Sequence, residues 1–447
     1  MLHPVLAMAI GIVVMMALII FTKMHAFPSL IISAILIAVL AMPFGSVDSL
    51  TACVKTVTTG FGNTMGSIGV VIGFGCIMGI FLEKSGAAKR MALTILKLVG
   101  VKNCDVVLGL TGFVVSIPVF CDSAFVLLSP IAKRISKDTK ISMTTMAVAL
   151  CMGLHATHMF VPPTPGPLAV AGILNADLGY VILFGALVSI PVMLVGYFGA
   201  VFMGKKYDYL PENVADVPEN QKLPSPLMAF LPILTPIMLM LLKTIGQMCG
   251  LQGVLMDIFA VLGTPAVALL VGLIIALVGY HQIFPEDTKA WGFDGVFADA
   301  LKTAGQIILI VGAGGAFSGV LKASPLQAIL TNTFSGLTIG ILAPFIIGFI
   351  FRTCVGSATI AMVTAATMIT PLMDVLGFAS PMGRVIAMLA CAAGGLMVFH
   401  GNDDFFWVTA TTSEMDTSVA YKTIPIISVC QSLAALAVVF VLSLIFI

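Results

Sequence analysis

The segment 106–129, VVLGLTGFVVSIPVFCDSAFVLLS, is one apolar run with basic residues on both of its flanks. The preceding group is Lys84, Lys89, Arg90, Lys97 and Lys102, and the following group is Lys133, Arg134, Lys137 and Lys140. Basic residues next to membrane segments collect on the cytoplasmic side, so both ends of the run are expected there. A single crossing cannot begin and end on one side. The run is therefore predicted to be a re-entrant hairpin with its tip at residues 116–123, where Pro118 and short polar side chains can leave the helix.

The composition of the whole chain places this hairpin in a lipid bilayer. Hydrophobic residues make up 60% of the 447 residues, charged residues only 9%, and the mean hydropathy is +1.14. A soluble domain carries about 25% charged residues. Apolar runs recur along the chain at about the 20-residue length that a membrane-spanning helix needs, so we predict an all-α polytopic membrane protein with about 10–12 spanning helices.

Charge and cysteine content exclude other classes of protein. The net charge of +1 provides no field that would attract nucleic acid, so no nucleic-acid partner is expected. The nine cysteines include no CxxC pair, and most lie within apolar stretches, where cysteine behaves as a small hydrophobic residue. We therefore predict no metal site, no disulfide framework and no cofactor.

The second half of the chain repeats the features of the first half in the same order. Glycine-rich stretches at 68–79 and 308–319 are followed by Lys-Ser and Lys-x-Ser, the latter at residues 322–324. Broken apolar segments with Ser-Ala pairs come next, at 123–124 and 357–358, and then histidine-bearing interruptions at 155–167 and 400–404. Inverted repeats with broken helices are typical of secondary transporters. The alternative for the glycine stretches alone is ordinary close packing of membrane helices.

These features predict the organisation of the chain. It comprises an N-terminal helix (1–25), a first inverted repeat (26–204), a cytoplasmic linker loop (205–225), a connecting helix (226–253) and a second inverted repeat (254–447). The first repeat contains the hairpin 106–129 and a broken helix at 143–174, and the second contains a hairpin at 338–377 and a broken helix at 381–408. The charged residues at 83–90 and 133–140 are expected in solvated loops.

Two ionisable residues lie at the predicted hairpin tips. A charge inside a membrane costs about 2.5–3.5 kcal/mol even on insertion scales, so each needs an explanation. Arg352 could bind a carboxylate through two parallel hydrogen bonds, and Asp122 could take up a proton. The alternative is that Arg352 and Asp122 form structural contacts, either with each other or with backbone groups.

Two further polar clusters interrupt apolar segments. In residues 154–167, LHATHMFVPPTPGP, four prolines within six residues cannot continue a helix, which leaves backbone groups next to His155 and His158 open to a ligand. In residues 399–407, FHGNDDFFW, Asp403 and Asp404 would not be tolerated facing lipid. We expect one of the two carboxylates to line a site or a proton route and the other to point toward the interface.

The motifs resemble those of a known family. Thr157-His158-x-Phe160-x-Pro162-Pro163-x-Pro165-Gly166-Pro167, followed by Asn175-Ala176-Asp177-x-Gly179, is similar to the signature of the GntP family of gluconate permeases. Further matches, in the family's order and over essentially the whole chain, are Gly73-Phe74-Gly75-x-x-x-Gly79, Gly356-Ser357-Ala358-Thr359 and His400-x-Asn402-Asp403-x-x-Phe406-Trp407.

The resemblance implies proton-coupled symport of gluconate or a related small hydroxy acid across a bacterial inner membrane. It also implies an elevator-type carrier of the wider ion-transporter superfamily. Relatives implied as alternatives carry idonate, D-serine or glycerate-like acids, with proton or sodium coupling. The chain departs from the family's pattern at Thr164, Asp122, Asp404 and Phe405, which leaves open which acid is carried.

The expected mechanism is alternating access by a moving domain built from the two hairpins and the two broken helices, with the other helices as a scaffold and homodimer interface. Arg352, with Ser123, Thr157, Ser357, Thr359 and Asn402, is expected to bind the carboxylate substrate, and Asp122, His158 or Asp403 to carry the proton. Two other functions remain possible: a membrane-embedded enzyme using His155 or His158 with Asp403, which no HExxH or GxSxG motif supports, and an ion-only exchanger, against which Arg352 argues.

Overall fold

Every regular element that the structure describes is a helix, as predicted. The structure is a computed structural model that describes residues 4–22, 24–41, 50–100, 104–212, 222–323, 340–401 and 403–447. Within these ranges six helices are long and apolar enough to cross a membrane, and seven shorter apolar helices of 10–17 residues accompany them. The prediction of an all-α polytopic membrane protein is confirmed.

The helices fall into two consecutive series. The first is α1 (Pro4–Thr22), α2 (Ala26–Ala41), α3 (Leu50–Lys84), α4 (Ala87–Val99), α5 (Cys104–Val115), α6 (Cys121–Thr139), α7 (Met143–His158), α8 (Pro165–Leu174) and α9 (Leu178–Lys206). The second is α10 (Pro226–Met248), α11 (Val254–Leu262), α12 (Pro265–Ile283), η3 (Thr288–Trp291), α13 (Val296–Ala323), α15 (Leu342–Val355), α16 (Ala358–Ile369), η4 (Thr370–Leu372), α17 (Pro381–Leu396), α18 (Asp404–Thr412) and α19 (Thr417–Phe446).

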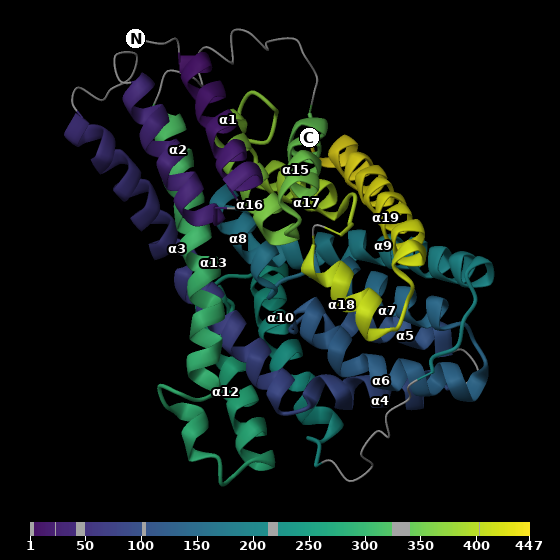
Figure 1. The fold of residues 1–447 in the computed structure, drawn as a ribbon. Helices are drawn as coiled ribbons and strands as arrows, with labels where there is room; N and C mark the ends of the chain where they lie inside the picture. The colour runs from purple at the N-terminus through teal and green to yellow at the C-terminus, as the bar shows by residue number, and fades with distance from the viewer. Residues whose placement is uncertain are drawn as a thin grey trace.

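Corresponding helices of the two series pack in similar ways. The long helices α3 and α13 lie side by side at the left of Figure 1, with α2 and α12 against them. In the first series α5 packs on α7, and in the second α15 packs on α17. The two series are joined at α8, which packs against both α16 and α17. The marked chain ends both lie at the top of Figure 1.

Four breaks interrupt the helices where the sequence carries proline, glycine or polar residues. They separate α5 from α6, α7 from α8, α15 from α16 and α17 from α18. Gly356 ends α15 in the left-handed region, with φ 83°, a conformation that costs a residue with a side chain more than glycine. Pro165 starts α8, because its missing N–H is not needed in a first turn. The domain boundaries and the entry of the α5–α6 and α15–α16 pairs from opposite membrane faces stay predictions. Ser324, the start of the predicted 338–377 hairpin and part of the linker lie outside the described residues.

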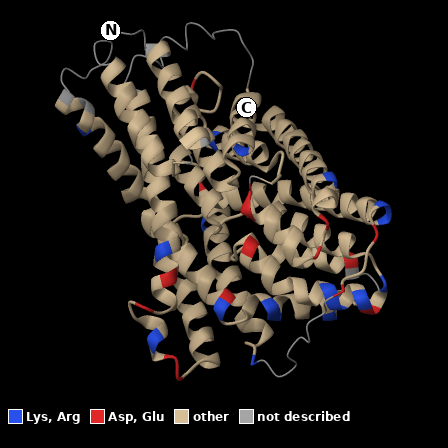
Figure 2. Cartoon of the chain, in the orientation of Figure 1, with Lys and Arg blue, Asp and Glu red and all other residues tan. Residues whose placement is uncertain are grey.

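The charged residues at 83–90 and 133–140 lie on helices and not in loops, except Lys140, but Lys84, Arg134, Lys137, Asp138 and Lys140 are exposed as expected. Residues from Ala87 onward form α4, and α6 continues through Lys133 to Thr139. Lys89 is buried, and Arg90 Nε donates to the carbonyl oxygen of Pro224 at 2.6 Å. These helices are amphipathic, so the charges lie beside apolar residues that pack on neighbouring helices. Charged residues gather on the lower and right-hand edges of the molecule in Figure 2, with few in its upper half.

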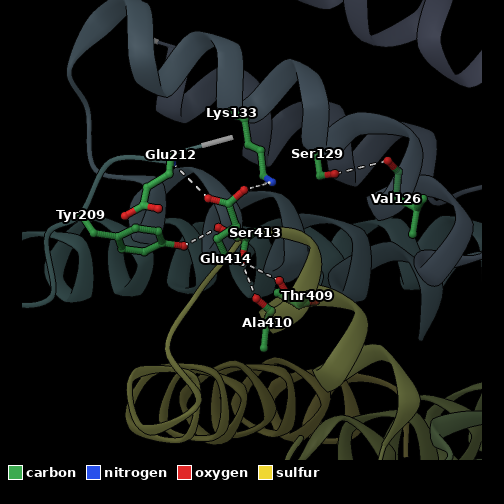
Figure 3. A network of polar contacts seen from close by, with 9 residues as sticks. All are labelled: Val126, Ser129, Lys133, Tyr209, Glu212, Thr409, Ala410, Ser413 and Glu414. Atoms are coloured by element: carbon green, nitrogen blue, oxygen red, sulfur yellow. Dashed lines mark hydrogen bonds and ion pairs between the residues drawn. The ribbon is translucent and has the colours of Figure 1, made fainter. Parts of the chain in front are cut away.

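One polar network joins α6 to the turn between α18 and α19 (Figure 3). Lys133 Nζ lies 2.7 Å from Glu414 Oε1, and the other carboxylate oxygen of Glu414 accepts from the backbone N–H of Glu212 at 3.0 Å. Tyr209 donates its hydroxyl to the carbonyl oxygen of Ser413 at 2.8 Å. Burial raises the pKa of Tyr209, so this phenol remains a donor. The network holds an element of the first series against one of the second.

Glycines at two equivalent crossings provide a test of the packing. A Cβ at Gly153 of α7 would collide with the carbonyl oxygen of Gly109 in α5, and one at Gly394 of α17 with that of Phe345 in α15. We expect Gly153→Ala and Gly394→Ala each to lower stability by about 1–3 kcal/mol, because a rigid backbone cannot yield. Thermal unfolding in detergent measures this. Gly73→Ala is the matched control, since nothing lies within 4 Å of its added Cβ; equal melting temperatures in all three variants would contradict the packing.

Candidate functional site

The chain breaks surround a polar cavity of about 230 Å³. Its lining comes from the α5–α6 break, the end of α7, the α15–α16 break and the start of α18. The residues are Phe120, Cys121, Asp122, His155, His158, Val355, Gly356, Ser357, Ala358, Thr359, Asp403, Asp404 and Phe405. Elements far apart in the sequence therefore contribute to one site.

Three helices begin at this cavity. The first residues of α6, α16 and α18, namely Cys121, Ala358 and Asp404, all line it. The start of a helix has unpaired N–H groups and a partial positive charge, which together favour an anion. Ser357 and Asp403 cap two of these starts, with Ser357 Oγ accepting from Ile360 N at 3.4 Å and Asp403 Oδ1 from Phe405 N at 2.8 Å. The backbone at these three helix starts therefore contributes a positive electrostatic potential, which favours a carboxylate independently of the side chains.

Arg352 lies directly behind the lining. It is in the last turn of α15 and only 1% exposed. Its Nη1 donates to Asp403 Oδ2 and to the carbonyl oxygen of Gly356. The guanidinium also lies over the ring of Phe399, with 5.1 Å between Cζ and the ring centroid. The structure therefore pairs Arg352 with Asp403. Of the alternatives considered from the sequence, a pair with Asp122 or a contact with backbone, it shows the second, at the carbonyl of Gly356.

Aromatic rings surround the buried side of this ion pair. The Phe399 and Phe405 rings stack at 5.4 Å, and the imidazole of His155 lies 4.9 Å from Phe399. These rings keep water from the buried side of the guanidinium and so strengthen its interaction with a carboxylate. In the sequence, Phe405 stands out as a departure from the family pattern and His400 and Phe406 as parts of a motif, but their spacing does not predict the stacking of Phe399 on Phe405.

Several polar groups at the cavity lack partners within the described part of the chain. The buried Nδ1 atoms of His155 and His158 make no hydrogen bond there. The side chains of Asp122 and Asp404 are exposed to the cavity, and no hydrogen bond or ion pair to another described residue involves their carboxylates. These groups are available to a ligand, to water or to a proton. Among the described residues no group of three or more His, Cys, Asp or Glu side chains could hold a metal ion.

The structure brings together most, but not all, of the predicted site residues. Asp122, His158, Ser357, Thr359, Asp403, Asp404 and Phe405 line the cavity, with Arg352 behind them. Thr157 is not part of the lining, because it is fully buried and its hydroxyl donates to the carbonyl oxygen of Phe113 at 2.7 Å. Ser123 is half-buried outside the lining, and Asn402 lies outside the described residues. Thr164 supports the α7–α8 break, donating to the carbonyl oxygen of Val161 at 2.8 Å.

Fold and site together define a polytopic helical membrane protein with a polar cavity between broken helices, which is the architecture of a transporter. The chain belongs to the GntP family: residues 3–445 match the GntP family permease profile. It is therefore a multi-pass permease of the bacterial inner membrane, and permeases are not enzymes.

Similar proteins include two named carriers. A gluconate permease of Pseudomonas aeruginosa is 31% identical over 440 residues, covering 95% of this chain and 94% of the relative. The D-serine transporter DsdX of Escherichia coli K12 is 32% identical over 447 residues, covering 98% and 97%. Among solved structures, the YdaH transporter of Alcanivorax borkumensis superposes with a TM-score of 0.65, covering 94% of this chain and 98% of the other, at 14% identity. That likeness concerns the fold alone.

Proposed function

We propose that this permease is a secondary transporter that carries gluconate or a related small hydroxy acid into the cell together with a proton. The observation that supports this best is the convergence of three helix starts on a cavity backed by Arg352. The carboxylate of the acid would bind at the starts of α6 and α16, where Ser357 and Thr359 present hydroxyl groups. The Pseudomonas relative is named a gluconate permease, which agrees with a sugar acid as the substrate.

Coupling to a proton follows from the Arg352–Asp403 pair. When Asp403 is ionised, its Oδ2 atom accepts a hydrogen bond from Nη1 of the guanidinium. Protonation of Asp403 weakens this bond and releases the guanidinium toward the cavity, where a substrate carboxylate would replace the lost negative charge. Proton and acid then stabilise the same state, which is the thermodynamic requirement for symport. Asp122 and His158, which also line the cavity, are the other two residues that we propose as proton carriers.

The movement we propose is an elevator-type displacement of the elements around the cavity. α5 to α8 and α15 to α18 would move as one body, since α8 packs on α16 and α17 and the Lys133–Glu414 pair joins α6 to the α18–α19 turn. The long helices α3 and α13 would form part of the scaffold, with a homodimer contact among the remaining helices.

A second candidate substrate is a small amino acid or glycerate-like acid, carried with a proton or with sodium. The observation in its favour is the pair of exposed carboxylates, Asp122 and Asp404, in the same lining as the helix starts. They would suit the ammonium group of a zwitterion, while the helix starts hold its carboxylate. The D-serine transporter among the relatives is named for such a molecule.

Uptake into proteoliposomes tests both candidates. Labelled gluconate, D-serine and glycerate are offered with an inward proton gradient, with an inward sodium gradient, and with neither. We expect gluconate to accumulate above its external concentration only with the proton gradient, because the acid and the proton are released together inside. Empty liposomes serve as the control. If none of the three accumulates with either gradient, the proposed function is wrong, and if D-serine alone accumulates, the second candidate replaces the first.

A further inference from the structure

A second cavity, of about 250 Å³, lies where α3, α13 and the end of α8 meet. Its polar lining is Asn63, Thr64 and Ser67 of α3, Asn175 after α8 and Ser318 of α13, and the remainder is four glycines and one isoleucine. None of these residues is charged, and none lines the first cavity. The sequence motifs that meet here, the glycine stretch at 308–319 and the Asn175 motif, have no part in the function proposed above.

The two cavities lie at opposite ends of α8. At its start, a Cβ on Gly166 would lie 3.6 Å from Oγ1 of Thr359, which lines the first cavity. At its end, Gly172 and Asn175 line the second cavity. A ten-residue helix is about 15 Å long, so the cavities are separate sites on one short helix.

Polar side chains at the second cavity lack partners among the described residues. Ser318 is 5% exposed, faces the cavity, and its hydroxyl has no hydrogen-bond partner in that part of the chain. Asn63 of α3 is exposed, and its amide makes no hydrogen bond to another described residue. An unpaired hydroxyl on a buried residue costs free energy, so Ser318 favours an occupant of the cavity that forms hydrogen bonds.

The chemistry of the lining selects for hydroxyl groups over charged groups. The lining offers hydroxyls, side-chain amides and the C-terminal end of α8, where the helix dipole carries partial negative charge and disfavours a carboxylate. The volume nearly equals that of the first cavity, which is enough for a small organic molecule but large for a single dehydrated cation. We propose that this cavity is a second binding site, which takes small polyhydroxylated molecules through their hydroxyl groups.

Protection of a cysteine tests this site without any transport measurement. Ser67→Cys places a thiol in the lining, and its reaction with a membrane-impermeant thiol reagent is followed on purified protein with and without the uncharged polyol xylitol. We expect xylitol at about ten times its dissociation constant to slow labelling about tenfold, because the site is then about nine-tenths occupied. Thr59→Cys, exposed on α3 outside the lining, is the matched control, and the unmodified chain corrects for its native cysteines.

Two additional variants separate the sites. Ser318→Ala in the Ser67→Cys protein should raise the xylitol concentration needed for protection about fivefold, through loss of one hydrogen bond. Arg352→Lys, which changes the first site, should leave protection unchanged. The proposal is overturned if xylitol does not slow labelling at all, if sodium ions protect and xylitol does not, or if protection disappears with Arg352→Lys. These protection results do not depend on transport, so they are expected even if the protein transports none of the acids tested.

Discussion

Arg352→Lys is expected to weaken binding of the transported acid about 10- to 100-fold, the loss that follows when hydrogen bonds between charged groups worth about 1.5–3 kcal/mol are removed. Lysine keeps the positive charge but has no planar fork, so it cannot bind the substrate carboxylate through two parallel hydrogen bonds as the guanidinium would. It also loses the flat contact with the Phe399 ring. The measurement is the concentration dependence of acid uptake into proteoliposomes.

Controls for this variant address charge, location and folding. Arg384→Lys makes the same exchange at a half-buried position in the first turn of α17, outside the cavity lining, and should leave uptake unchanged. Thermal unfolding in detergent shows whether Arg352→Lys is folded. An Arg352→Lys protein that is folded and binds the acid with unaltered affinity would remove Arg352 from the substrate site.

The sequence was sufficient to predict the class of fold and the places where the helices break. Hydropathy runs, basic flanks and the proline clusters depend on local chemistry, so they can be read without knowing the tertiary structure. The amphipathic segments were harder. The charges at 83–90 and 133–140 suggested loops, but nearly all of them lie on α3, α4 and α6, because long basic side chains can lie along an apolar surface.

The site was predictable in composition but not in its pairings. Asp122, Arg352 and Asp403 were each identified by the cost of a charge in a membrane, yet nothing in their spacing indicates that Arg352 contacts Asp403, 51 positions away, instead of Asp122. Thr157 is a residue for which the sequence suggested a role that its contacts do not support. Its position beside a broken helix suggested a ligand, but the crossing of α5 and α7 directs its hydroxyl to the Phe113 carbonyl. The three helix starts at the cavity are a property of the packed backbone and leave no mark in any single motif.

Asp403→Asn is expected to abolish accumulation driven by the proton gradient while exchange of internal for external acid continues. Asparagine resembles the protonated aspartate: it cannot neutralise Arg352, so the guanidinium is released toward the substrate at every pH. If Asp403 carries the proton as proposed, the affinity of the unmodified protein for the acid depends on pH, and the affinity of the variant should not. Asparagine is as good a helix cap as aspartate, so the start of α18 should be preserved.

The matched control is Asp404→Asn, which removes the neighbouring charge from the same cavity lining without touching the Arg352 pair. It should retain gradient-driven accumulation. Counterflow and net uptake are measured on the same vesicle preparations, so that loss of coupling is distinguished from loss of protein. If Asp403→Asn accumulates the acid as the unmodified protein does, the proton is carried elsewhere. Asp122→Asn and His158→Gln, examined in parallel, would then show which of the two remaining groups in the lining carries it, because only the variant at the proton carrier would lose accumulation and keep exchange.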